Sequence, residues 1–146
     1  MWFTSLDLEQ GVGYMTIDGN TFYRGAGFAI QTQRGNENDH LCHNTVTNNV
    51  IDATNAVLNT GITHDASGYI GVFGQYNTVT GNTVTTLEQS SGIHIKCSDN
   101  SITNNTVTIA SNGWFTIDIT AVANNNVVTG NSVNKPIRNS GTGNTL

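Results

Sequence analysis

The sequence predicts an all-β solenoid, a single chain wound into about five to six stacked coils. Three observations predict it. A nine-residue pattern recurs along the chain, aliphatic and polar residues alternate within it, and its second Asn returns at intervals of 29, 33, 23 and 26 residues. Repeats with a period in this range are typical of stacked coils. The five copies span residues 15–23, 44–52, 77–85, 100–108 and 126–134.

Each copy of the pattern predicts two short strands joined by a tight corner. Val79 is flanked by threonines, the pair Gly81-Asn82 follows, and alternation resumes around Val84. Period-2 alternation of β-branched residues indicates a strand, and Gly and Asn adopt left-handed backbone conformations at low cost. A hairpin-rich sandwich is the alternative. Only stacked coils explain the regular return of Asn, because each buried Asn then bonds to its counterparts above and below.

One further strand is predicted in each coil, before the repeated pattern. Ile70 and Ile93 each lie twelve residues before their corner Asn, so we expect them to stack in register. Residues 34–40 are interpreted as a loop, and the irregular stretch 56–67 lengthens the following coil; within it, residues 61–65 fit either a strand or a loop. After Val133 the pattern decays into a segment containing Pro and Gly. The predicted strands lie within residues 6–9, 28–31, 68–73, 92–96 and 114–119.

The composition favours short strands and limits the classes of partner. The 146 residues include 22 Thr, 21 Asn and 16 Gly but one Pro, which leaves little room for long helices. We expect one domain, residues 1–146, although a fragment of a longer solenoid would look the same. No apolar run is long enough for a membrane span, and no signal peptide is visible. A net charge of −5 without a Lys/Arg cluster argues against nucleic acid and anionic membranes as partners.

Residues 92–107 carry a family resemblance. They read Gly-Ile-x-Ile, followed by Ser-x-Asn-x-Ile-x-x-Asn-x-Val. This pattern resembles the right-handed parallel β-helix repeat of the pectate-lyase-like superfamily, which includes polygalacturonases, alginate lyases, mannuronan epimerases and phage tailspike depolymerases. The resemblance covers roughly residues 6–134 and rests on inward aliphatic residues and corner Asn. It implies a right-handed single-stranded parallel β-helix that binds an acidic or surface polysaccharide over the outward face of its first sheet. It also implies an extracellular or phage-surface location.

Alternation indicates which side chains lie on that outward face. If Ile93 and Ile95 are buried, His94 and Lys96 face solvent. Adjacent parallel coils lie about 4.8 Å apart, so we expect His94 to reach Asp118 in the next coil. Gly71, Phe73 and Thr120 are assigned to the same face, and Ala29, Gln31, Asp7 and Glu9 extend it toward the N-terminus.

The predicted catalytic residues are His94, Asp118 and Lys96. An imidazole beside a carboxylate moves protons, and the Lys ammonium neutralises a substrate carboxylate. The predicted activity is that of a polysaccharide lyase, a glycoside hydrolase or a uronate epimerase. A solvated polar face without catalysis stays open, because outward residues of a sheet are polar in any case. The predicted substrate-binding residues are Tyr69, Phe73, Trp114 and Gln31.

No cofactor or metal site is predicted. The polygalacturonase set of paired Asp, Gly-His-Gly and Arg-Ile-Lys is absent, although residues 94–96 partly resemble its last element. A pectate-lyase-type Ca²⁺ site needs clustered carboxylates and an Arg base, and none of the three Arg, Arg138 included, falls at an expected strand position. Asp7 and Glu9 offer oxygen ligands to Ca²⁺, but alternating charges on an edge strand are typical of a solvated pair.

Two other classes of function fit the pattern. Threonines recur on the outward side of both strands around each corner, which resembles the Thr ladders of ice-binding β-helices; exposed strands also favour Thr for its β propensity alone. A shaft or fibre module without catalysis, forming a trimer or stacking coil end on coil end, is the remaining alternative.

Overall fold

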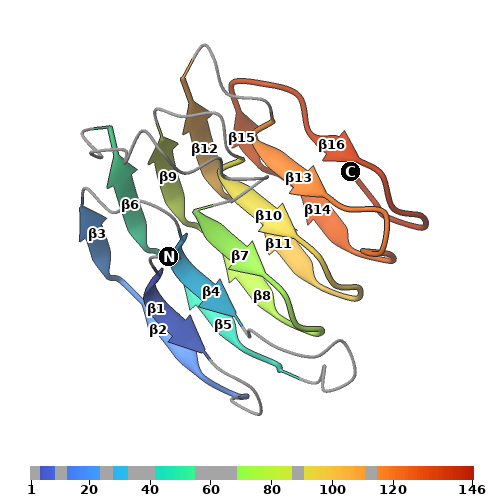
Figure 1. The fold of residues 1–146 in the computed structure, drawn as a ribbon, viewed down its shortest axis with the longest axis horizontal. Helices are drawn as coiled ribbons and strands as arrows, with labels where there is room; N and C mark the ends of the chain where they lie inside the picture. Colours follow the sequence, from blue (N-terminus) through green and yellow to red (C-terminus); the bar gives the residue numbers. More distant parts are fainter. Residues whose placement is uncertain are drawn as a thin grey trace, which may run out of the picture.

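The protein is a parallel β-helix. The computed structural model describes residues 4–8, 13–23, 28–32, 42–54, 69–86, 91–110 and 115–146. Within these ranges every regular element is a strand and all strand pairs are parallel, as the sequence predicts. Figure 1 shows the coils following one another along the long axis, from the blue N-terminal coil to the red C-terminal one. The same ranges contain no helix long and apolar enough to cross a membrane.

Each of the first five coils contributes one strand to each of three sheets, and the C-terminal coil adds a sixth strand to the first sheet. Neighbours in a sheet therefore come from successive coils. The first sheet contains β1 (Thr4–Leu8), β4 (Phe28–Thr32), β7 (Ile70–Val72), β10 (Ile93–Ile95), β13 (Ile117–Ile119) and β16 (Arg138–Asn139). The second contains β2 (Thr16–Asp18), β5 (Thr45–Thr47), β8 (Thr78–Thr80), β11 (Ser101–Thr103) and β14 (Val127–Thr129). The third contains β3 (Thr21–Tyr23), β6 (Val50–Ala53), β9 (Thr83–Thr86), β12 (Thr106–Ile109) and β15 (Ser132–Val133).

The predicted Asn ladder forms the corner between the second and third sheets. At each step the side-chain oxygen of one Asn accepts hydrogen bonds from the backbone N–H and the side-chain amide of the Asn one coil earlier, at 2.9–3.1 Å. The residue before each Asn has a left-handed backbone, as at Gly81 (φ 66°) and Asn104 (φ 56°). The ladder comprises Asn20, Asn49, Asn82, Asn105 and Asn131.

A second Asn ladder runs beside the entry to the second sheet. The backbone N–H of Met15 donates to Asn44, and the same contact repeats through Asn77, Asn100 and Asn126. Buried backbone and amide groups are costly when unpaired, so both ladders fix the registration of the coils. The pattern of two Asn per repeat therefore encodes two aligned corners.

Stacked aliphatic residues fill the interior. Ile70, Ile93 and Ile117 pair in register and are fully buried, which confirms the predicted stacking of Ile70 on Ile93. Val79 and Ile102 form an equivalent column in the second sheet. Burial of each such side chain contributes roughly 1.5–3 kcal/mol of hydrophobic free energy. Because these residues occupy alternate positions, the residues between them lie on the outer faces of the sheets.

The repeat does not end at Val133. Arg138–Asn139 forms β16 against β13, and Val127 bridges to Thr145. Asn144 accepts hydrogen bonds from Asn126 at 2.7 and 3.0 Å, which extends the second ladder by one step. The coils therefore continue beyond the last copy of the repeated pattern, because a shorter coil preserves the contacts of the second ladder with fewer residues.

Candidate functional site

One file of outward residues crosses the first sheet. Strand registration aligns Asp7 with Gln31, Gln31 with Gly71, Gly71 with His94, His94 with Asp118, and Asp118 with Arg138. We call these six residues the polar file. The sequence correctly predicted that the residues from Asp7 to Asp118 in this file lie on the outward face. The predicted alignment was wrong at one strand, where Gln31, and not Ala29, aligns with Gly71.

His94 and Asp118 form the central contact of the polar file. Nδ1 of His94 lies 3.2 Å from Oδ2 of Asp118, as the sequence predicts. Contrary to the prediction of a solvent-facing histidine, His94 is only 2% exposed and Asp118 is fully buried. Phe73 packs edge-on against the imidazole, with ring centroids 6.0 Å apart. The pair therefore lies outside the core but is shielded from water.

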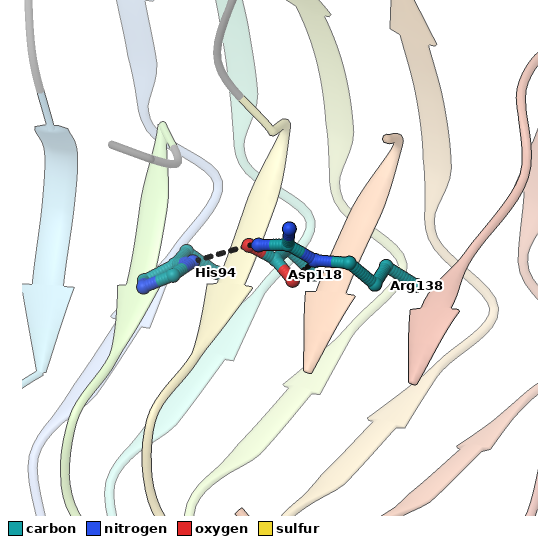
Figure 2. A network of polar contacts seen from close by, with 3 residues as sticks. All are labelled: His94, Asp118 and Arg138. Carbon is teal, nitrogen blue, oxygen red and sulfur yellow. Dashed lines mark hydrogen bonds and ion pairs between the residues drawn. The ribbon is translucent and has the colours of Figure 1, made fainter. Parts of the chain in front are cut away.

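Arg138 completes the network and was missed by sequence reasoning. Its Nε donates to Oδ1 of Asp118 at 2.6 Å and its Nη2 to Oδ2 at 2.5 Å, and its guanidinium lies over the ring of Phe115. Figure 2 shows Asp118 between the other two side chains. The available signal was the dipeptide Ile137-Arg138, which repeats the buried-outward order of Ile93-His94. This signal was missed because the repeated corner pattern is lost after Val133.

The electrostatics keep Asp118 ionised. Burial by itself raises the pKa of a carboxyl group, but hydrogen bonds from His94 and Arg138 and the positive charge of Arg138 outweigh it. The pKa of Asp118 therefore lies below its ordinary value of 3.8. The hydrogen bond to Asp118 likewise raises the pKa of Arg138. Near neutral pH the carboxylate of Asp118 can only accept hydrogen bonds.

The donor and acceptor nitrogens of the His94 imidazole can consequently be assigned. An ionised carboxylate accepts, so Nδ1 carries the hydrogen that lies between the two side chains. Nε2 is then the acceptor nitrogen of the neutral ring. It is buried and has no hydrogen-bond partner among the described residues. Figure 2 shows the ring extending from β10 toward β7, with Nε2 on the side away from Asp118.

The other predicted site residues are spread around this network. Lys96 is exposed, and its Nζ lies 5.3 Å from the ring centroid of the half-buried Phe73. Gln31 is buried in the polar file. Tyr69 belongs to the hydrophobic core, with 3% of its surface exposed, and so presents no ring face to solvent. Trp114 and Glu9 lie outside the described residues, as do the predicted loops 34–40 and 56–67.

No metal centre emerges from the described part of the chain, where no three His, Cys, Asp or Glu side chains are grouped to hold an ion. The donor set around His94 contains one carboxylate, which Arg138 already occupies with two hydrogen bonds. The chemistry available here is proton transfer and hydrogen bonding.

The outward threonines of the second sheet form two aligned ranks. Thr103 Oγ1 donates to Thr80 Oγ1 at 3.2 Å, and the flanking side chains are partly exposed. One rank contains Thr16, Thr45, Thr78, Ser101 and Val127. The other contains Asp18, Thr47, Thr80, Thr103 and Thr129.

Comparison of the chain with protein-family models, with curated proteins and with solved structures gives no match.

Proposed function

We propose that the protein engages an acidic or surface polysaccharide on the outward face of its first sheet and that His94 accepts a proton from the bound sugar or from a water molecule beside it. One observation carries the proposal: Nδ1 of His94 is held by Asp118, while Nε2 is a shielded acceptor without a partner among the described residues. A general base needs a lone pair without a partner and a neighbour that orients the ring, and the substrate has to displace whatever covers that lone pair.

Neighbouring side chains support the remaining roles. The exposed ammonium of Lys96 offers a positive charge to a substrate carboxylate, and Phe73 beside it offers a ring for contact with a sugar. Because Nε2 is buried, the substrate reaches it by displacing the ring edge of Phe73, which packs on the imidazole. Proton abstraction at Nε2 serves a lyase, a hydrolase or an epimerase, and the products distinguish these classes.

The decisive experiment is a glycan array coupled to two product assays, one for new reducing ends and one for unsaturated uronates. Binding with turnover is expected, and His94→Ala should lower turnover at least about 100-fold because a general base contributes 10²–10⁴-fold. Lys96→Gln should weaken binding of acidic glycans, whereas Lys135→Gln is the matched control. Absence of both binding and turnover would overturn the proposal, and an oligomer in sedimentation would then favour the shaft.

The threonine ranks support a second candidate, ice binding by the second sheet. The specific observation is the alignment of Thr47, Thr80, Thr103 and Thr129 on successive strands, which gives hydroxyls at the regular spacing of the coils. The test is thermal hysteresis. An ice-binding face should lose it in Thr80→Tyr, because a phenol ring interrupts the flat rank, while His94→Ala should retain it.

A further inference from the structure

The polarity of His94 depends on a residue that does not touch it in any described contact. Arg138 donates two hydrogen bonds to Asp118 and balances its charge. Asp118 therefore needs no second positive partner, and a neutral imidazole that donates through Nδ1 satisfies its remaining acceptor capacity. Lys96 is the other cation beside this face, and its ammonium lies over Phe73. In the neutral imidazole, Nε2 is therefore the acceptor nitrogen.

The surroundings of Nε2 define what it can accept. A buried acceptor without a partner destabilises the folded protein, so a donor that fills this position removes that cost. Gly71 is the residue opposite His94 on β7, and Gln31 is the residue opposite Gly71 on β4. Gly71 has no side chain, and Figure 2 shows the imidazole extending over β7, so Nε2 faces toward Gln31 on β4, two strand spacings or about 10 Å between backbones from β10.

A hydroxyl group fits this position better than other ligands. It donates to Nε2 and accepts from an amide N–H of the kind that Gln31 carries. A carboxylate has no hydrogen to donate, and the described residues supply no ligand set for a metal ion. We propose that the outward face above Gly71 is a hydroxyl-binding site in which His94 Nε2 is the acceptor and Arg138 is the positioning residue that acts through Asp118.

This assignment extends the polysaccharide proposal. It rests on that proposal in one respect, namely that the bound hydroxyl belongs to a sugar. The polarity of the imidazole and the role of Arg138 are independent of any substrate. They are therefore tested on the free protein, whereas the ligand is tested by titration.

The first experiment measures the two ring nitrogens of His94 by long-range ¹H–¹⁵N correlation NMR near neutral pH, with the signals assigned by His94→Gln. Nδ1 should resemble a protonated, pyrrole-type nitrogen and Nε2 an unprotonated, pyridine-type one. In Arg138→Gln the carboxylate keeps only His94 as a cationic partner, so both nitrogens should become pyrrole-type. Lys135→Gln removes a positive charge from the same part of the chain but leaves the Arg138–Asp118 pair, and should retain the original signals.

An Nε2–H tautomer in the unaltered protein would overturn the assignment of Nε2 as acceptor, and unchanged signals in Arg138→Gln would overturn the positioning role. If Arg138→Gln fails to fold, Asp118→Ala provides the second variant. It removes the acceptor that holds the hydrogen on Nδ1, so both tautomers should be populated. Retention of Nδ1–H alone in a folded Asp118→Ala would equally contradict the proposal.

The second experiment titrates the same protein with a uronate oligosaccharide and with a neutral glucan oligosaccharide. A hydroxyl donor at Nε2 should shift that resonance and leave Nδ1 nearly unchanged. Gly71→Ala should weaken the effect at least several-fold, because its methyl group enters the space above β7, while the tautomer of His94 persists. A confirmed tautomer that neither sugar perturbs would refute the sugar hydroxyl as ligand and leave the role of Arg138 intact.

Discussion

The outward faces of the first and second sheets follow the same strand geometry but differ in character. The second sheet carries ranks of small, partly exposed threonines, of which Thr80 and Thr103 share a hydroxyl–hydroxyl bond. The first carries a charged network in which His94 and Asp118 are shielded from water. Exposed Thr follows from β propensity alone. Shielded ionisable groups on an outer face do not, and buried ionisable groups in contact with charged partners are candidates for a functional site.

The comparison also separates the scaffold from the candidate site. The Asn ladders lie at the corners and hold the coils together irrespective of either face. The polar file adds contacts between three successive strands of the first sheet, through His94, Asp118 and Arg138. If the file serves chemistry, its removal should destabilise the fold less than removal of a ladder residue.

The largest loss of stability is therefore expected for Asn105→Ala. Its side-chain oxygen accepts from the N–H and amide of Asn82, and its amide donates to the buried carbonyl of Val79. Leaving these groups unpaired should lower the free energy of unfolding by about 3 kcal/mol or more. Urea denaturation measures it. The control is Asn104→Gly, which keeps the left-handed corner and should change stability by less than about 1 kcal/mol.

Asp118→Ala should have the next largest effect. It leaves His94 and Arg138 without their shared acceptor, but the Arg138 side chain is 38% exposed and can turn to water. The expected loss is about 2 kcal/mol, below the 3–5 kcal/mol typical of a fully buried pair. Denaturation under the same conditions gives the comparison with Asn105→Ala. A loss as large as that of the ladder variant would identify the network as part of the scaffold.

The contribution of Asp118 should also depend on pH. Its pKa in the folded protein lies below the ordinary carboxyl value of 3.8. The unfolded state thus binds the proton more tightly, and the stabilisation is complete above that value and is lost as the pH falls below it toward the folded pKa. Melting temperatures of the unaltered protein and of Asp118→Asn should converge in this acidic range. A constant difference down to pH values well below 3.8 would contradict the ionised state assigned to Asp118.

The smallest effect is expected on the second sheet. Thr103→Ala removes one partly exposed hydroxyl bond to Thr80, so the free energy of unfolding should fall by less than about 1 kcal/mol. A double-mutant cycle with Thr80→Ala isolates the coupling of the two hydroxyls. A coupling as large as the loss in Asp118→Ala would show that the threonine ranks, and not the polar file, carry the specialised contacts of the molecule.

Sequence reasoning predicted the coils, the aligned corners and the contact between His94 and Asp118, because each depends on periodicity. It missed Arg138, whose coil is shorter than the others and lacks the nine-residue pattern. It also placed His94 in solvent. Alternation decides which side of a strand a residue lies on, but it contains no information about what packs over that side.

The order of residues along the chain thus determined the repeat, the two columns of Asn and the face to which each strand residue belongs. These features depend on local alternation with a period of two and on Gly or Asn at recurring left-handed corners, and both are visible in the sequence. Tertiary structure alone decided that Phe73 packs on the imidazole of His94 and that Arg138 donates two hydrogen bonds to Asp118. These contacts join side chains from separate coils, and their distances and burial depend on how the coils stack.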